Sequence, residues 1–463
     1  MTAQVAQVAQ EQVPRTVPGA RRRGRGAGAL AVIAGCNAMI QLDDPIVNVA
    51  LPGMREELGL SAVGASWVVN AYLLAFGGLL LLGGRAGDIL GRRKVFIAGV
   101  GLFTAAASLR GLAPSGDLLV ALRAVQGAGA ALAAPSGLAL LLSTFAEGAS
   151  RKRAIAVCTT AGAVSTAGGL LLAGALTAFG SWRWVLFLDV PAGVAIMLLA
   201  PFVLDETARH RGRFDLAGAL LSALAAAFLV YGLGRAAERP WTDPQVVGCL
   251  LAGAVLLAVF AAVERRAQQP IVVPRLFAGR DRLLAYLGTL AVPGALIGAY
   301  FFLNQHFQRQ HGWSALAMAC ALLPLPVAMA VTAGFAVRLE QRVGARRLWA
   351  AGACLLVTGN VWLSTLGAGD AYAATVLPAL VLLGAGMACG VLPPTVLATS
   401  RLRGDEAGAA SSVLNSVQSV GGSIGLAALV TVAAHAGGMS GGFVAAAGFA
   451  GCALLAALFV RER

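Results

Sequence analysis

The sequence of 463 residues is 58% hydrophobic and only 12% charged, whereas about 25% of the residues in a soluble domain are charged. This composition excludes an ordinary soluble protein and indicates a membrane protein. The formal net charge of +14 does not call for a nucleic-acid partner, because apolar runs divide the basic residues into short clusters between them. No stretch between the runs is long enough for a separate soluble domain.

Apolar runs of about 18 to 25 residues recur along the chain after residue 27. Each run can cross about 30 Å of hydrocarbon as a helix that rises about 1.5 Å per residue. We therefore predict an all-α polytopic membrane protein with fourteen transmembrane helices. The predicted spans are 28–50, 63–83, 95–113, 118–142, 154–178, 184–204, 215–235, 245–263, 283–304, 314–336, 348–366, 372–398, 407–434 and 441–460.

Basic residues are distributed unevenly between the two sides of this predicted bundle. With the N-terminus inside, most of the 35 lysines and arginines lie on the cytoplasmic side, which is the positive-inside bias that sets topology. We expect both termini to be cytoplasmic. The many Ala, Gly and Arg residues and only two lysines suggest a GC-rich bacterial genome, so the predicted location is a bacterial cytoplasmic membrane.

Signals for enzymatic or metal chemistry are missing from the sequence. The seven cysteines fall one to a predicted helix with no paired spacing, which predicts neither a disulfide framework nor a zinc site. The chain has no G-x-x-x-x-G-K phosphate loop, so ATP is not the expected energy source. We therefore expect no enzyme activity, no metal and no cofactor.

The first predicted helix carries two carboxylates, Asp43 and Asp44. A charge near the bilayer centre costs roughly 2.5 to 3.5 kcal/mol on insertion scales, so such a residue usually has a function. Asp43 lies roughly 12 Å from the outer end of its helix, and Arg123 lies roughly 8 Å from the outer end of helix four. The two side chains are therefore expected to meet, and we predict Asp43 as a proton site with Arg123 as its partner. A static ion pair between the two helices is the alternative.

Two six-helix groups are predicted on either side of a central helix pair. The loop from Gly84 to Lys94 and the segment from Arg338 to Arg347 each follow a predicted span, turn at glycine and end in basic residues. Related six-helix halves are typical of secondary transporters, whose substrate sites lie between the halves. The predicted divisions are a cytoplasmic tail 1–27, a six-helix bundle 28–204, a two-helix insertion 205–282 and a second six-helix bundle 283–463.

Four segments carry a specific resemblance to a known family. The loop Gly84–Lys94 resembles the loop signature of the major facilitator superfamily, with a glycine, an acid four residues later, a second glycine and a basic run. The segments Leu42–Pro52, Trp67–Tyr72 and Arg123–Gly129 strengthen this resemblance. Over essentially all of its length after residue 27, the chain resembles the fourteen-helix drug:proton antiporter branch of that superfamily.

The resemblance implies the major facilitator fold, alternating access, and export of drugs, dyes or antibiotics driven by proton entry. It supports Asp43 and Arg123 as the proton-coupling residues. Asp88 is expected to face the start of a helix near Ala407, and Arg92 or Arg93 is expected to pair with Glu147. The residues implied for the gating loop are Gly84, Asp88, Gly91 and Arg92.

Polar residues within the predicted spans are candidates for a substrate cavity, although each one is also suited to ordinary bonding between helices. Helices ten and thirteen carry no acid within the predicted spans, so we expect neutral, weakly acidic or monocationic lipophilic substrates. Besides substrate, the expected partners are protons and the lipid bilayer, and the protein is expected to be a monomer. The candidate cavity residues are Asn37, Gln41, Asn70, Gln126, Asn304, Asn415 and Gln418.

Two other functions fit the sequence. The helix-five glycine pattern of the antiporter branch is altered here, because Leu170 follows Gly169 and Ala173 precedes Gly174. This change favours a proton-linked or facilitative carrier of a single metabolite. A sensor built on a transporter fold is the third hypothesis, which the intact Asp43 argues against.

Overall fold

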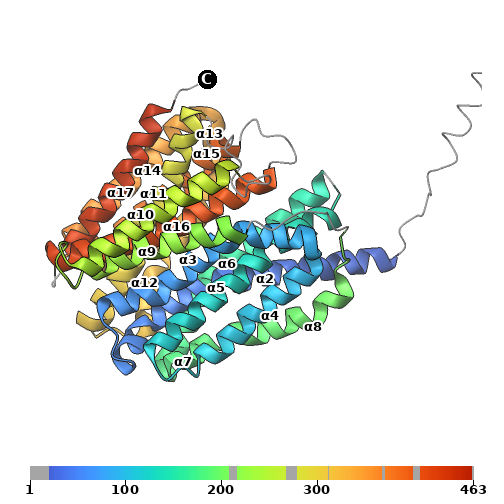
Figure 1. Cartoon of the computed structure of the whole chain (residues 1–463), viewed down its shortest axis with the longest axis horizontal. Coiled ribbons are helices and arrows are strands. Elements are labelled where there is room, and N and C mark those ends of the chain that lie inside the picture. Colours follow the sequence, from blue (N-terminus) through green and yellow to red (C-terminus); the bar gives the residue numbers. More distant parts are fainter. Residues whose placement is uncertain are drawn as a thin grey trace, which may run out of the picture.

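The computed structural model describes residues 20–146, 148–207, 216–266, 279–310, 312–367, 371–399 and 407–460. Throughout these ranges the chain is helical, and they contain no β-strand. The long helices lie side by side and reverse direction from one pass to the next, which produces one elongated bundle (Figure 1).

The first group of helices runs from residue 20 to residue 203 and makes six passes through the bundle. Helix α2 begins at Ala20, so it starts within the predicted tail and extends beyond the predicted span. Helices α7 and α8 together make the sixth pass. The elements are α2 (Ala20–Glu57), α3 (Ala62–Leu90), α4 (Arg92–Arg110), α5 (Gly116–Thr144), α6 (Ala149–Phe179), α7 (Trp182–Leu186) and α8 (Asp189–Val203).

The last group also makes six passes. A π-helical turn, η2, extends α11, and α12 and α13 together make one pass. The elements are α11 (Arg280–Gln305), η2 (His306–Gln310), α12 (Ala315–Leu322), α13 (Pro324–Val343), α14 (Ala345–Ser364), α15 (Tyr372–Thr399), α16 (Ala407–His435) and α17 (Met439–Phe459).

Helices α9 (Leu216–Ala236) and α10 (Pro244–Arg266) lie between the two groups in sequence and pack against each other. Helix α9 also contacts α3 of the first group and α16 of the last. The Trp67 ring on α3 lies 5.8 Å from the Tyr231 ring on α9. On the other side, Thr431 Oγ1 of α16 donates a hydrogen bond to the Leu233 carbonyl oxygen of α9. The central pair therefore joins both groups.

Eleven helices in the described ranges are long and apolar enough to cross a membrane. The other three passes, α4, α9 and α14, lie in the same bundle. Helix α4 starts with the basic run 92–94, α14 carries Arg346 and Arg347 in its first turn, and the apolar part of α9 spans only Leu220–Ala236. The order and number of passes are consistent with the fourteen predicted spans.

The two ends of the bundle differ in charge. The predicted loop 84–94 is helical except at Gly91, because α3 continues to Leu90 and α4 begins at Arg92. We call the end that carries these residues the basic end, and the end that carries Glu57 and Ser61 the far end. Gly91 connects α3 to α4 at the basic end with φ 108°, a conformation that favours glycine. A β-carbon there would also lie 2.8 Å from the Glu206 carboxylate. The predicted loop glycine is therefore required for a sharp connection.

Glycines bring the helices of the first group into close contact. A β-carbon at Gly83 of α3 would overlap the carbonyl oxygen of Ala131 on α5, and one at Gly127 of α5 would overlap the carbonyl oxygen of Tyr72 on α3. Such close backbone approach is how small residues stabilise helix pairs in membranes. In the last group, Gly421 of α16 meets the backbone of Leu290 on α11 in the same way.

We predict that Gly83→Ala destabilises the protein by about 1 to 3 kcal/mol, because the added methyl group forces α3 and α5 apart. The matched control is Gly168→Ala, since a β-carbon at Gly168 meets nothing within 4 Å. The melting temperature of the purified protein in detergent is the measurement. Equal melting temperatures for the two variants would contradict this packing.

Candidate functional site

Asp43 and Arg123 meet in the interior of the first helix group, as the sequence predicts. Both side chains are buried, and Arg123 Nη1 donates a hydrogen bond to Asp43 Oδ2. Arg123 Nε donates to the carbonyl oxygen of Val68 at 2.8 Å, and the guanidinium carbon lies 4.4 Å from the Tyr72 ring centroid. Arg123 is therefore held by a carboxylate, a backbone carbonyl and an aromatic ring at once.

Gln126 connects this pair to further polar groups. Its Nε2 atom donates to Asp43 Oδ1 at 2.9 Å, and its Oε1 atom accepts from Arg123 Nη1 at 3.0 Å. The same Oε1 accepts from Arg110 Nη1 at 2.7 Å. Gln126 was predicted as a cavity residue, but the structure places it inside the ion-pair network, fully buried.

Two members of the network were missed by the sequence analysis. Arg110 Nη1 lies 2.6 Å from Asp43 Oδ1, and Arg110 Nη2 lies 2.7 Å from Asp189 Oδ2. The side chains of Arg110 and Asp189 are fully buried. Arg110 lies near the outer end of the predicted span 95–113, where a basic residue is easily assigned to the adjoining loop. Asp189 lies within a predicted apolar span, and that position alone is a signal of function.

Helix ends position these two residues. Arg110 is the last residue of α4, with Gly111 as its C-cap, and Asp189 is the first residue of α8. A cation at the C-terminus of a helix and an anion at the N-terminus are both stabilised by the helix dipole. The local backbone therefore favours each charge in addition to the ion pair between them.

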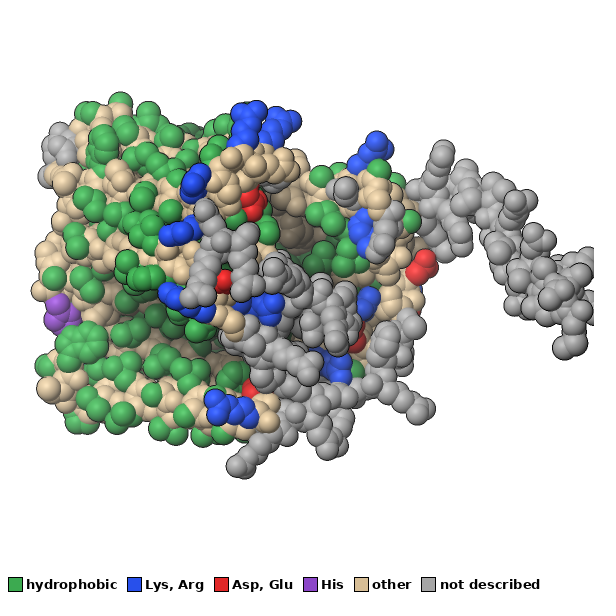
Figure 2. All heavy atoms as spheres, turned by 90° about the horizontal axis from the view of Figure 1, so that it is seen from above, with side chains coloured by type: hydrophobic (Ala, Val, Ile, Leu, Met, Phe, Trp, Pro, Cys, Tyr) green, Lys and Arg blue, Asp and Glu red, His purple; other side chains and the backbone are tan. Residues whose placement is uncertain are grey.

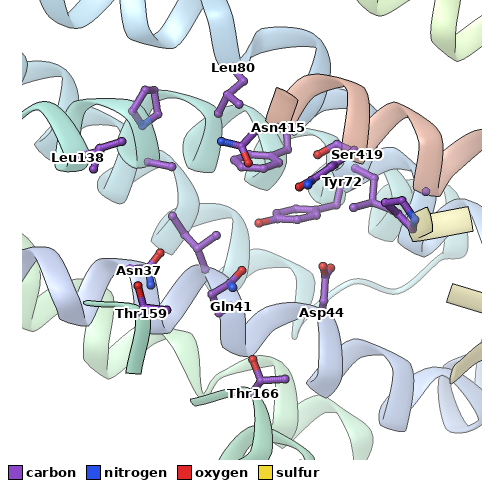
Figure 3. A pocket seen from close by; sticks show the side chains of 18 of the residues that line it. Asn37, Gln41, Asp44, Tyr72, Leu80, Leu138, Thr159, Thr166, Asn415 and Ser419 are labelled. Carbon is purple, nitrogen blue, oxygen red and sulfur yellow. The ribbon is translucent and has the colours of Figure 1, made fainter. Parts of the chain in front are cut away.

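A cavity of about 1430 Å³ lies between the two helix groups beside this network. Asp44 faces the cavity, with 47% of its side chain exposed, and its Oδ1 lies 3.8 Å from Arg123 Nη2. Figure 3 shows the Asp44 carboxylate and the Tyr72 ring directed into the same space as Gln41. Asp44 thus connects the buried network to the cavity.

The predicted cavity residues separate into two sets. Asn37 and Gln41 from α2 and Asn415 and Gln418 from α16 line the cavity, on opposite sides of it. Asn37 Nδ2 also donates to the carbonyl oxygen of Cys158, which lines the cavity as well. The structure places the remaining predicted members, Gln126, Asn70 and Asn304, away from the cavity lining.

Asn304 lies at the far end, where it joins the two helix groups. Its Nδ2 donates to the Asn48 carbonyl oxygen on α2, and Arg55 Nη1 of α2 donates to Gln305 Oε1 of α11 at 2.6 Å. Asn70 is fully buried in α3. These contacts between α2 and α11 close the bundle at the far end.

At the opposite end, the cavity reaches the predicted gating loop. Gly84, Arg85, Asp88 and Arg92 line it there. Figure 2 shows Lys and Arg side chains gathered on either side of a hollow in the surface. The cavity therefore extends to the basic end of the bundle and is closed at the far end.

The predicted gating loop makes polar contacts within the described residues. Asp88 Oδ1 of α3 pairs with Arg92 Nη2 of α4 at 2.9 Å, across the Gly91 connection. The Arg93 backbone amide donates to Glu206 Oε1 at 3.1 Å. Glu147, the expected partner, lies outside the described residues, as does the side chain of Ala407. In the described ranges no group of His, Cys, Asp and Glu residues is arranged to hold a metal ion.

A bundle of apolar helices in two groups, with a large cavity between them that is closed at one end, defines a polytopic membrane transporter. The chain belongs to the major facilitator superfamily: the family model described as Major Facilitator Superfamily matches residues 33–426. The resemblance that the sequence motifs indicate is confirmed.

Characterised relatives are similar over most of the chain. The puromycin resistance protein pur8 of Streptomyces alboniger is 39% identical over 414 residues, which cover 88% of this chain and 82% of that protein. The cephamycin export protein CmcT of Amycolatopsis lactamdurans is 37% identical over 428 residues, with coverage of 90% and 88%. The lincomycin resistance protein of Streptomyces lincolnensis is 33% identical, with coverage of 95% and 91%.

Solved structures agree on the fold. The crystal structure of an auto-inhibited POT family peptide transporter matches with a TM-score of 0.69 and 16% sequence identity, covering 94% of this chain and 97% of that chain. The crystal structure of a single-residue mutant of the nucleoside transporter NupG matches with a TM-score of 0.66 and 10% identity, covering 93% and 98%. The major facilitator fold predicted from the sequence is therefore confirmed.

The cavity predicts which cysteines react with thiol reagents. In single-cysteine variants of the purified protein, a polar maleimide should label Cys158, which lines the cavity, about tenfold faster than Cys36, which is buried at 2% exposure. Labelling is measured by mass spectrometry under the same conditions for both. Labelling of Cys158 as slow as that of Cys36 would contradict a water-accessible cavity.

Proposed function

We propose that the protein exports small lipophilic compounds, including antibiotics, in exchange for protons. The observation that carries the proposal is a buried Asp43 beside a large cavity, with its neighbour Asp44 facing that cavity. Relatives named for puromycin resistance and cephamycin export support antibiotic-type substrates. Asp43 is the proton site, and Arg123 is its partner.

Protonation of Asp43 changes what holds α2 in place. As a carboxylate, Asp43 attracts two guanidinium groups, Arg123 on α5 and Arg110 on α4. A proton on Asp43 removes that attraction and weakens the connection of α2 to its neighbours. Proton binding therefore acts on the position of α2 within the first helix group.

The same helix carries the far-end contacts. Asn48 lies five positions after Asp43, roughly 8 Å along the helix, and its carbonyl oxygen accepts from Asn304 of α11. Pro45 lies between Asp43 and Asn48 within α2. Proline removes a backbone donor and bends helices. Movement at Asp43 is thus transmitted through α2 to the contacts that close the far end, which is what alternating access requires.

The basic end faces the cytoplasm in this proposal, because basic residues concentrate on the cytoplasmic side of bacterial inner-membrane proteins. Both termini are then cytoplasmic, and compounds enter the cavity from the cytoplasm or the inner leaflet. The loop residues Asp88 and Arg92 act as part of the cytoplasmic gate. Residues 28–204 and 283–463 form the two moving halves around the insertion 205–282, and one monomer is sufficient for transport.

A carrier of a single metabolite is the second candidate. The glycine pattern of α6 is altered at Leu170 and Ala173, and this change favours such a carrier. The altered segment lies where the two helix groups meet, because Gly174 packs against the backbone of Leu316 on α12. Export of several unrelated antibiotics by cells that express the protein would rule out the single-metabolite carrier.

Asp43→Asn is expected to abolish energised efflux. We predict that cells expressing the wild-type protein expel lipophilic dyes and antibiotics, that a protonophore stops this efflux, and that Asp43→Asn reduces it to the level of cells without the protein. Asp117→Asn, an exposed carboxylate at the start of α5, is the matched control at equal expression. Full efflux by Asp43→Asn would refute the assignment of the proton site.

Substrate charge should limit export. Asp44 and Asp88 are the carboxylates among the described residues that line the cavity, and Asp88 lies at its basic end, paired with Arg92. A single carboxylate deep in the cavity can balance one positive charge. We expect efflux of neutral and monovalent lipophilic compounds and about tenfold weaker efflux of a divalent quaternary-ammonium compound of similar size. Equal efflux of the monovalent and divalent compounds would contradict this substrate class.

A further inference from the structure

The proposed mechanism uses Asp43 and leaves a second buried carboxylate, Asp189, without a role. Asp189 is fully buried at the start of α8, and its Oδ2 lies 2.7 Å from Arg110 Nη2. Its Oδ1 is also buried and has no hydrogen-bond partner among the described residues. A buried carboxylate oxygen without a donor is costly, and a proton on the group lowers that cost.

Arg110 is shared between two carboxylates. Its Nη1 contacts Asp43 and its Nη2 contacts Asp189, at 2.6 Å and 2.7 Å. With Arg123 and Asp44, the charged groups form a chain in which acids and bases alternate, from Asp189 through Arg110, Asp43 and Arg123 to Asp44 at the cavity. Three carboxyl groups thus face two guanidinium groups, which leaves one negative charge in excess. One proton neutralises it.

Asp189 lies toward the far end of the first helix group. It follows α7 by three residues, and Arg183 of α7 pairs with Glu57 at the far end at 2.9 Å. Asp189 therefore lies on the far-end side of α8. The charged and titratable groups that act on Asp189 are Arg110 from α4, Asp43 from α2, Arg123 from α5 and Tyr72 from α3.

We propose that Asp189 is a second proton-carrying residue of the exchange, which acts on Asp43 by competing with it for Arg110. This inference rests on the proposed function, in which Asp43 is the proton site. When Asp189 takes a proton from water, an O–H bond forms there, one negative charge disappears, and Arg110 pairs with Asp43 alone. When Asp189 returns the proton to water, the two carboxylates share Arg110 again, and Asp43 binds a proton more readily.

The competing explanation is structural, with Asp189 serving only to balance Arg110. A pH profile, together with the number of protons exchanged per dye molecule, separates the two roles. In Asp189→Asn, Asp43 has both guanidinium groups to itself, so more acid is needed to protonate it. The pH midpoint of substrate/proton exchange in proteoliposomes should then shift toward lower pH by about one unit or more. Loss of a carboxylate that stays ionised and only balances Arg110 also shifts this midpoint but leaves the number of protons per dye molecule unchanged, whereas loss of a proton-carrying Asp189 lowers that number.

The experiment compares five purified proteins in proteoliposomes at matched protein content. They are the wild type, Asp43→Asn, Asp189→Asn, Asp189→Glu and the exposed control Asp117→Asn. The probes are a fluorescent lipophilic dye and an internal pH indicator, so that dye movement and proton movement are measured together. Asp189→Glu keeps a carboxyl group and should restore most of the wild-type midpoint, and Asp117→Asn should match the wild type.

The outcomes distinguish this inference from the proposed function. Loss of proton coupling in Asp43→Asn, together with a shifted midpoint and fewer protons per dye molecule in Asp189→Asn, supports both. Loss of coupling in Asp43→Asn with a wild-type midpoint or a wild-type number of protons per dye molecule in Asp189→Asn supports the proposed function and overturns the role of Asp189. Normal coupling in Asp43→Asn overturns the proposed function and, with it, this role of Asp189.

Folding of the variants is checked by gel filtration and melting temperature. If Asp189→Asn is not monodisperse, Asp189→Ser replaces it, because serine is smaller and also neutral, and the same shift is expected. If neither neutral variant folds while Asp189→Glu does, Asp189 is a structural counter-charge of Arg110, and the proposal is wrong.

Discussion

Two arginines buried inside a membrane bundle impose the strongest constraint on this structure. A charged side chain removed from water is tolerated only when partners of opposite charge surround it, and loss of one partner of a buried pair costs about 3 to 5 kcal/mol. Arg110 on α4 and Arg123 on α5 draw their partners from α2, α3, α5 and α8. The network therefore connects five helices of the first group.

Depth along a helix can be estimated from sequence, and rotation about its axis cannot. The contact between Asp43 and Arg123 followed from depth alone, since both residues lie at similar distances from the outer ends of their helices. Asn304 also lies at a suitable depth, but its side chain turns toward the Asn48 carbonyl oxygen and not into the cavity. Asn415 and Gln418 line the cavity because their face of α16 points there.

Charged residues near the end of a predicted transmembrane span are difficult to assign to the span or to the loop that follows it. Arg110 ends α4, and a positive residue at that place resembles any loop residue until the partner from α8 is known. The fold could be predicted from the sequence with fewer errors than the site, because fourteen apolar runs and four motif segments are independent signals that agree. The sequence does not show which buried charges pair with one another. Each buried charge needs a counter-charge, and the packing of α2, α4, α5 and α8 identifies it.

The central helix pair makes the two sides of the bundle unequal toward the lipid. Helix α9 lies against both α3 and α16, so it covers one of the lines along which the two halves meet. On the opposite side, α6 meets α12 directly, with Gly174 at the contact. The surface that the bundle presents to the lipid therefore has one seam covered by α9 and a second seam at which α6 and α12 pack directly against each other.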